Sequence, residues 1–172
     1  RLELSPAEAT AGATEPPGLS WRPAARLRRG DLERLIERTY VGSLDCPGLT
    51  GLRRTRDVIV SHRTAGRFRP ECWWACEVEG ELAGCVLVND AAQGVESEIV
   101  YLGVADGHRR QGVGKTLLQR AISQAAGRGR TALTLAADAA NIPAINLYAR
   151  NGFGAVRRRQ VWLRTGSKSG CA

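Results

Sequence analysis

The apolar positions at the start of this chain predict two helices and one short strand. Residues at helical spacing follow Asp31, a predicted N-cap: Leu32, Leu35, Ile36 and Thr39. A second helix is predicted over residues 54–64, and a strand over residues 19–27 precedes both helices. Residues 1–18 are rich in Pro, Ala, Thr and Glu without a sustained period, so we expect a flexible tail there.

Three strands are predicted next. The segments CWWACEVEG and ELAGCVLVND flank a Glu-Gly-Glu turn and have the pattern of an antiparallel hairpin, with Trp73 and Trp74 on opposite sides of their strand. The segment SEIVYLGVAD, residues 97–106, is an almost continuous apolar run, which is typical of a central strand.

The second half of the chain alternates between helix and strand. After the loop 107–111, one apolar stripe predicts a helix: Val113, Leu117, Leu118, Ala121, Ile122 and Ala125. A strand over 131–138, a helix over 142–151 and a strand over 153–164 follow. The pattern predicts a single α/β domain over residues 19–165 and a loose tail over residues 166–172.

The composition is that of an ordinary globular domain. The chain has 172 residues, of which 43% are hydrophobic and 24% charged. No stretch approaches the ~20 apolar residues of a membrane span, and no export signal opens the chain, so we expect a cytoplasmic protein without membrane contact. The first residue is Arg and the chain has no Met, which leaves open whether an N-terminal segment is missing.

The net charge of +8 raises the question of a nucleic-acid ligand. Of the 25 basic residues only Lys115 and Lys168 are lysines, and the arginines are scattered along the chain. This usage is more typical of a coding bias than of a surface selected to bind phosphates. Nucleic acid is therefore disfavoured, and an anionic small ligand would use the same charge.

The cysteines and histidines do not predict a metal site. The five cysteines form no C-x-x-C pair: Cys46, Cys72, Cys76, Cys85 and Cys171. The only two histidines, His62 and His108, stand alone, whereas a zinc site needs about four converging ligands. We expect no metal, and buried free thiols in a reducing compartment.

The segment HRRQGVGKTLLQ, residues 108–119, has two interpretations. Its Gly-Lys-Thr ending is that of a nucleoside-triphosphate loop, and LTLAAD further on resembles the strand with a magnesium-binding Asp. However, G-x-x-x-x-G-K-[ST] requires a glycine at position 109, where this chain has Arg109, and that glycine shapes the nest of N–H groups around the phosphates. The nucleotide interpretation is therefore disfavoured.

The second interpretation uses two motifs. Residues 109–114, RRQGVG, fit R/Q-x-x-G-x-G/A between an apolar strand and an amphipathic helix. About thirty residues later, NIPAINLYARNGF fits N-x-x-A-x-x-x-Y-x-x-x-G-F at five positions: Asn141, Ala144, Tyr148, Gly152 and Phe153. Together they resemble the GNAT superfamily of acyl-CoA-dependent N-acyltransferases. The resemblance extends from about residue 20 to 163 and is strong over residues 96–153.

The resemblance implies a mixed, mostly antiparallel sheet whose two central parallel strands splay to admit acetyl-CoA. It also implies direct transfer of an acetyl group to a primary amine, with acetyl-CoA as co-substrate. The backbone of Leu102, Gly103 and Val104 would pair with the pantetheine arm, Asn141 would contact the coenzyme near the splay, and Tyr148 would face the thioester sulfur. The pyrophosphate cradle would comprise Arg109, Arg110, Gln111, Gly112, Val113, Gly114, Lys115 and Thr116.

Glu98 is the candidate general base, through a water, because its place in the central strand resembles that of the catalytic glutamate in the histone-acetylating branch. Even spacing along a regular strand would point Glu98, Leu102 and Val104 to one face. Glu96 is a fallback on the same face. The oxyanion would be stabilised by a backbone N–H within residues 102–104.

Three questions stay open at this level. A non-catalytic acyl-CoA-binding or sensor domain with the same fold is the alternative to an enzyme, since fold does not imply function. The amine acceptor would be set by residues 32–69, which contain no recognisable motif. A homodimer is possible, and nothing in the sequence decides it.

Overall fold

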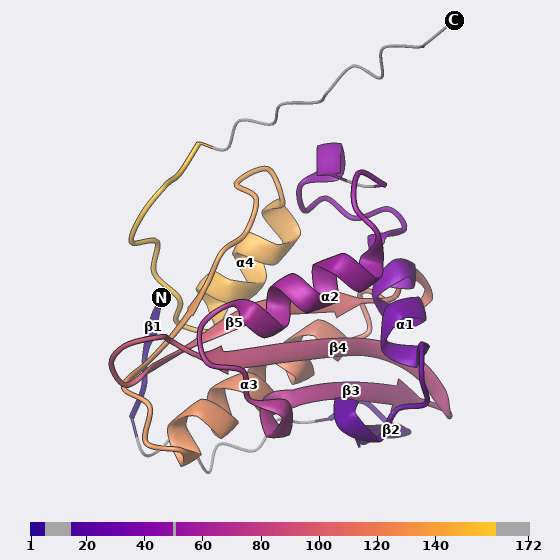
Figure 1. The fold of residues 1–172 in the computed structure, drawn as a ribbon, viewed down its shortest axis with the longest axis horizontal. Coiled ribbons are helices and arrows are strands. Elements are labelled where there is room, and N and C mark those ends of the chain that lie inside the picture. Colours follow the sequence, from indigo (N-terminus) through magenta and orange to yellow (C-terminus); the bar gives the residue numbers. More distant parts are fainter. Residues whose placement is uncertain (6–14, 50, 161–172) are drawn as a thin grey trace, which may run out of the picture.

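The computed structural model describes residues 1–5, 15–49 and 51–160. Its centre is a sheet of six strands in the order β1-β6-β5-β4-β3-β2 (Figure 1). The strands are β1 (Leu2–Glu3), β2 (Leu19–Pro23), β3 (Trp73–Val78), β4 (Glu81–Asp90), β5 (Glu96–Val104) and β6 (Ala132–Leu135). The helices are α1 (Asp31–Tyr40), α2 (Thr55–Thr64), α3 (Val113–Gly127) and α4 (Ile142–Arg150). Strands β5 and β6 are parallel, and all other neighbours are antiparallel.

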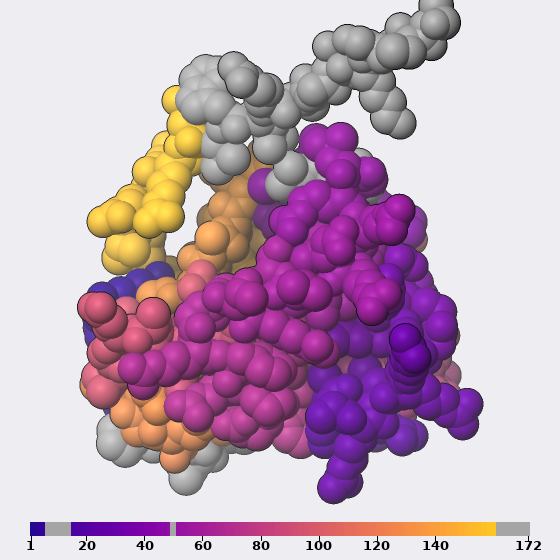
Figure 2. Space-filling model, in the orientation of Figure 1, coloured from indigo at the N-terminus to yellow at the C-terminus, as the bar shows by residue number. Residues whose placement is uncertain are grey.

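Helices cover both faces of the sheet, because alternate residues of the central strands are apolar on both sides. Val86 and Val88 of β4 pack in the cluster with α3 and α4, whereas Cys85 and Leu87 pack in the cluster with α1 and α2. In Figure 2 the region of α1 and α2 covers much of the face that is seen. The α/β class and the mixed, mostly antiparallel sheet predicted from the sequence are confirmed.

The hairpin prediction is confirmed in detail. Strands β3 and β4 pair antiparallel, and Trp73 and Trp74 belong to the two opposite core clusters. Cys72, Cys76 and Cys85 are buried free thiols as expected, but Cys46 is exposed, and Cys171 lies outside the described residues.

Four predictions near element ends differ from the structure. Gly30, with φ of 87°, is the N-cap of α1, and Asp31 is the first helical residue. Strand β2 ends at Pro23, where the chain turns into a short 3₁₀ helix. Residues 2–3, expected within a tail, form β1, because Leu2 has an apolar site beside β6 and is only 9% exposed.

The fourth difference is the strand predicted over 153–164. Residues 153–160 are not a strand, and the rest of that segment lies outside the described residues. The edge of β6 that faces away from β5 is instead paired with β1, and Gly154 exchanges two backbone hydrogen bonds with Arg1. The edge partner of β6 therefore comes from the start of the chain.

Asp90, the last residue of β4, joins the central strands to the end of α3. Its side chain is 2% exposed and is contacted by the guanidinium of Arg128 at 2.6 and 2.7 Å, by Nε of Arg69 at 2.6 Å and by Oγ of Ser97 at 2.9 Å. Burial by itself would raise the pKa of Asp90, but the hydrogen bonds from these three residues hold it below its ordinary value.

We predict that Asp90→Asn lowers the free energy of unfolding by about 3 kcal/mol near neutral pH, because the half-buried guanidinium groups of Arg69 and Arg128 lose the buried counter-charge between them. Since the pKa of Asp90 is lowered in the folded state, its contribution is present above the ordinary Asp pKa of about 3.9 and is lost as the pH falls through the folded value. Urea unfolding at several pH values should show the difference between wild type and variant shrinking in acid.

Glu81→Gln is the matched control, since Glu81 is 61% exposed in a surface ion pair with Arg38. This substitution should lower the free energy of unfolding by less than about 1 kcal/mol. The role given to Asp90 would be contradicted if both variants lost the same unfolding free energy. It would also be contradicted if the loss in Asp90→Asn did not depend on pH.

Candidate active site

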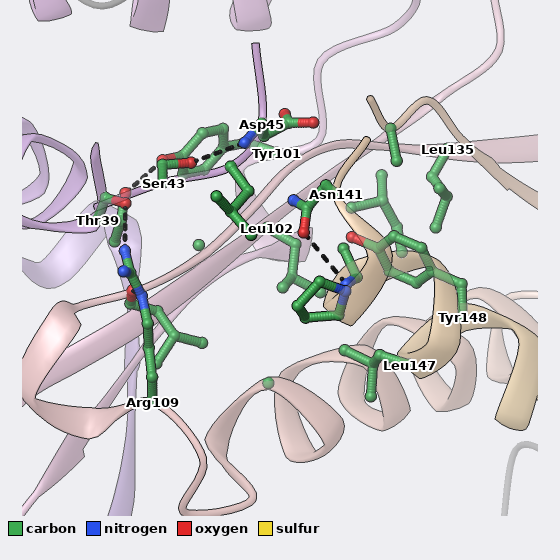
Figure 3. Close-up of a pocket in the computed structure, with 18 of the residues that line it drawn as sticks. Thr39, Ser43, Asp45, Tyr101, Leu102, Arg109, Leu135, Asn141, Leu147 and Tyr148 are labelled. Atoms are coloured by element: carbon green, nitrogen blue, oxygen red, sulfur yellow. Dashed lines mark hydrogen bonds between the residues drawn. The ribbon is translucent and has the colours of Figure 1, made fainter. Parts of the chain in front are cut away.

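The central cavity lies where β5 and β6 stop pairing. The two strands pair from Glu96↔Ala132 to Ile99↔Leu135 and then diverge. The space between them is a cavity of about 400 Å³. Its walls come from the end of α1 and the following loop (39–45), from residues 99–104 of β5, from residues 135–137 after β6 and from α4 (Figure 3). The predicted splay of two parallel strands is therefore present.

The open edge of β5 presents backbone polar groups to this cavity. Ala105 donates its N–H to Ala83 on the β4 side, at 2.8 Å. Because successive residues of a strand turn their N–H and C=O groups to alternate sides, those of Leu102 and Val104 face the β6 side, where pairing has ended. The carbonyl of Val104 accepts a hydrogen bond from Nε of Arg109 at 3.2 Å, so Leu102 offers the open donor and acceptor. The predicted residues 102–104 all line the cavity.

A bulge in β5 overturns the predicted orientation of Glu98. Val88 pairs with Ile99 and Leu87 with Tyr101, so Val100 has no partner in β4. Residues before and after this bulge no longer follow even spacing. Glu98 lies opposite Asn89, on the face covered by α2, whereas Leu102 lies opposite Val86, on the face covered by α3.

The expectation that Glu98, Leu102 and Val104 share a face is therefore wrong. Glu98 is exposed and does not line the cavity, and Glu96 does not line it either. A role of Glu98 as general base stays a prediction, and it would require an acceptor or a water chain that reaches around the strand.

The glycine loop before α3 ends at the mouth of the cavity. Arg110 (φ 63°) and Gly112 (φ 86°) adopt left-handed conformations, which turn the backbone around the start of the helix. Within the described residues, the N–H groups of residues 111–115 have no hydrogen-bond acceptor. Such a row of donors at a positive helix end is suited to an anion.

Not every predicted cradle residue faces the cavity with its side chain. Arg109, Arg110 and Gly114 line it, whereas Gln111, Gly112 and Lys115 lie beside it. Val113 is buried in the core, 1% exposed. Thr116 is also buried, and both its N–H and its hydroxyl donate to the carbonyl of Gly112, so it supports the loop from inside the helix.

The side chain of Arg109 is a clamp on the fold. Besides the carbonyl of Val104, its guanidinium donates to the carbonyls of Thr39 (2.9 Å) and Gly42 (3.1 Å) and pairs with Asp106 (3.1 Å). These bonds tie the end of α1 to the end of β5. Arg109 was expected within the pyrophosphate cradle, but four of its five N–H donors have acceptors within the protein.

Thr39 and Tyr101 form part of the same wall. The hydroxyl of Thr39 donates its single hydrogen to the carbonyl of Ile36 at 2.7 Å, so in their short contact the hydroxyl of Tyr101 must be the donor. Burial raises the pKa of Tyr101, which keeps its hydroxyl protonated. This part of the wall, formed by Thr39 and Tyr101, is therefore uncharged.

Asn141 and Tyr148 both face the cavity from α4, as predicted (Figure 3). Oδ1 of Asn141 caps the helix by accepting the N–H of Ala144 at 3.3 Å, which leaves its Nδ2 as a donor. The hydroxyl of Tyr148 points to the side of the cavity where Leu102 and Asn141 lie. Burial, and secondly the charge of Asp45, raise the pKa of Tyr148 to about 12.

Sequence reasoning missed the wall that follows α1. Ser43 and Asp45 line the cavity, and the carboxylate of Asp45 accepts the N–H of Asp138 at 2.8 Å. Both residues lie in a Pro- and Gly-containing loop without a motif, and the partner of Asp45 is 93 positions away, so that contact had no local signal.

Neither a membrane-spanning helix nor a cluster of metal ligands is found among the described residues. No helix there is long and apolar enough to cross a membrane. No three His, Cys, Asp or Glu side chains in that part of the chain are grouped as metal ligands would be.

The sheet opens between the two parallel strands β5 and β6, and the start of α3, with its open N–H groups, lies at the mouth of this opening. The family model described as "Acetyltransferase (GNAT) family" matches residues 39–153. The chain therefore belongs to the GNAT acetyltransferase family.

Curated relatives resemble only part of the chain. A streptothricin acetyltransferase of Streptomyces lavendulae is 38% identical over 79 residues, which are 46% of this chain and 42% of the relative. A mycothiol acetyltransferase of Streptomyces bingchenggensis (strain BCW-1) is 34% identical over 86 residues, 50% of this chain and 28% of the relative. The chain thus matches less than half of the length of each relative.

Solved structures share the fold. A GCN5-related N-acetyltransferase from Ralstonia eutropha JMP134 superposes with a TM-score of 0.61 over 85% of this chain and 99% of its own, at 22% identity. At that identity the similarity establishes the architecture, and the reaction has to be argued from the site.

Proposed function

We propose that the protein transfers an acetyl group from acetyl-CoA directly to a primary amine. The observation that carries this proposal is the open backbone edge of β5 at Leu102, which lines the same cavity as Gly114. The N–H groups of residues 111–115, unpartnered within the described part of the chain, lie at the mouth of that cavity. An extended arm with amide groups suits an open strand edge, and a diphosphate suits the start of α3. Coenzyme A has both groups on one molecule, in that order from the thiol end.

The chemistry follows from a neutral amine and a thioester. An alkyl ammonium has a pKa of about 10.4, so it must first lose a proton to water or to a base. The amine nitrogen then forms a bond to the thioester carbon and loses a second proton to water, the carbon–sulfur bond breaks, and the coenzyme leaves as a thiolate. The N–H of Leu102 is a candidate donor to the oxyanion of the tetrahedral state.

Tyr148 serves the departing sulfur as a hydrogen-bond donor in this proposal. Its pKa of about 12 lies well above the thiol value of about 8.5, so complete proton transfer to the thiolate would be uphill by about 5 kcal/mol. A hydrogen bond to the developing charge needs no such transfer.

The decisive test of the function is release of free coenzyme thiol from acetyl-CoA in the presence of a panel of primary amines, with the acetylated product identified by mass spectrometry. Turnover that depends on the amine supports the enzyme. Tight coenzyme binding without turnover for any amine would favour the alternative, a non-catalytic acyl-CoA-binding domain.

We predict that Gly112→Ala weakens acetyl-CoA binding about tenfold or more. Gly112 has φ of 86°, a conformation that costs a residue with a Cβ about 1–2 kcal/mol, so the loop would relax and its N–H groups would no longer converge. Titration calorimetry measures the Kd. Binding of Mg-ATP tighter than that of acetyl-CoA would contradict the proposed ligand.

Gly129→Ala is the matched control. Gly129 also has a positive φ, 69°, and lies just beyond the other end of α3, where a Cβ would meet no described atom within 4 Å. The two variants should lose similar stability, but only Gly112→Ala should lose affinity for the coenzyme. If both variants lost affinity for the coenzyme to the same extent, the loss in Gly112→Ala would be an effect of general destabilisation.

We predict that Tyr148→Phe lowers kcat by about 10- to 100-fold, the effect of one hydrogen bond to a charged group, with little change in the KM for acetyl-CoA. Because the pKa of Tyr148 is raised to about 12, the hydroxyl stays protonated through the neutral and mildly alkaline range, and an alkaline fall of kcat in that range should not come from it. The pH profiles of both proteins check this. An unchanged kcat with a raised coenzyme KM would make Tyr148 a binding residue only.

A further inference from the structure

The loop after α1 is fastened across the cavity to the loop after β6. Asp45 accepts the backbone N–H of Asp138 at 2.8 Å, and Asp138 accepts the backbone N–H of Cys46 at 3.2 Å. We call this reciprocal pair the 45–138 clasp. It joins the wall that comes from α1 to the wall that comes from β6, over the opening between β5 and β6.

The two carboxylates of the clasp differ in whether an oxygen atom is free to accept a further hydrogen bond. Both oxygens of Asp138 accept backbone N–H groups, one from Cys46 and the other from Ala140 at 2.9 Å. Asp45 uses only Oδ1, and its Oδ2 has no hydrogen-bond or ion-pair partner within the part of the chain that the structure describes. Asp138 is therefore a structural residue, whereas Asp45 has an open acceptor.

The free oxygen of Asp45 belongs to a residue that lines the cavity. Figure 3 shows Asp45 at the edge of the cavity, beyond Leu102 and Asn141. After burial, the charge of Asp45 is the second cause of the raised pKa of Tyr148. On the opposite wall it is the smallest cause of the raised pKa of Tyr101, after burial, Cys85 and Tyr40. The carboxylate of Asp45 is thus placed to interact electrostatically with a ligand that binds between the two walls.

Asp45 also lacks the basic partner that other acidic side chains of this chain have. Among the described residues no Lys or Arg pairs with Asp45, whereas arginines pair with Asp31, Asp90 and Asp106. Asp57 and Glu98 are likewise without an ion pair in that part of the chain, but they lie outside the cavity, which Asp45 lines. An unpaired carboxylate at the rim of a cavity is suited to a cation supplied from outside.

The cation at Asp45 is better assigned to a second group of the acceptor than to the reacting nitrogen. A neighbouring carboxylate raises the pKa of an ammonium, and the reacting nitrogen must lose its proton before it attacks. Asp45 is exposed at the rim, whereas Leu102 and Tyr148 lie deeper and are half-buried. The charged group would therefore be held outside while the reacting amine extends inward.

We propose that Asp45 is a specificity-determining residue that receives a second cationic group of the acceptor, an inference that rests on the proposed acetyl transfer. The acceptor is then an amine with at least two positively charged nitrogens. One nitrogen is held at Asp45 by a charge-assisted hydrogen bond, and the other reaches the thioester near Leu102.

The test compares Asp45→Asn with wild type on matched acceptors. Each dicationic amine is paired with a twin that lacks the second charge: cadaverine with pentylamine, and lysine amide with norleucine amide. Asparagine keeps an oxygen for the N–H of Asp138, so the clasp can remain, and the Kd for acetyl-CoA should be unchanged. Asp57→Asn removes the same charge from the exposed first turn of α2, outside the cavity, and is the control.

For wild type we expect kcat/KM to favour the dicationic member of a pair by about tenfold or more, and Asp45→Asn to remove that preference while Asp57→Asn keeps it. Added salt should raise the KM of dicationic acceptors for wild type and have little effect on the Asp45 variant, because a rim charge is screened. A merely structural Asp45 would change both members of a pair equally and would not alter the salt dependence.

Two outcomes overturn the inference in different ways. If wild type acetylates both members of each pair equally well, or Asp45→Asn keeps the preference, the role of Asp45 is wrong although acetyl transfer to amines stands. If no amine of either charge is acetylated while acetyl-CoA binds, the proposed function fails and this inference fails with it.

Discussion

Two parallel strands that pair over only four residues leave polar backbone groups open in the middle of the sheet. Strands β5 and β6 pair from Glu96↔Ala132 to Ile99↔Leu135, and beyond that the N–H and C=O of Leu102 have no strand partner among the described residues. Buried backbone groups without partners are costly, so such an edge persists only where solvent or a ligand can satisfy them. The cavity, its opening to the helix start and its capacity for an extended ligand all follow from this divergence.

Several contacts keep the opening from closing. Val100 is a bulge, which increases the local twist of β5 just where pairing with β6 ends. Arg109 ties Val104 to the carbonyls of Thr39 and Gly42, so the end of α1 cannot move independently of the strand. The 45–138 clasp fixes the loop after α1 to the opposite wall. The side chain of Arg109, which a motif assigned to phosphate, thus has a positioning role within the fold.

Local patterns predicted the elements well, because period and turn chemistry act over a few residues. The helices α1 to α4, the β3–β4 hairpin and the glycine loop were recognisable for this reason, as were Asn141 and Tyr148, which belong to a spaced motif. The orientation of Glu98 was not predictable, because one extra residue at Val100 reverses the faces and leaves no mark in the apolar pattern. Contacts of long sequence separation, such as Leu2 beside Leu133 or Asp45 beside Asp138, had no local signal either.

The net positive charge of the chain is a poor guide to its ligand, because many arginines are used inside the fold. Arg69 and Arg128 neutralise Asp90, and Arg120 lies over the rings of Trp21 and Trp74. What a ligand meets is the local arrangement: open N–H groups at the start of α3 on one side and the carboxylate of Asp45 on the other. Electrostatic interactions at a cavity weaken steeply with distance in water, so these nearby groups outweigh the total charge. A site with opposite charges at its two ends would bind an anionic acyl donor at one end and a cationic acceptor at the other. The acyl group and the reacting amine would then face each other between the two ends, as a direct transfer requires.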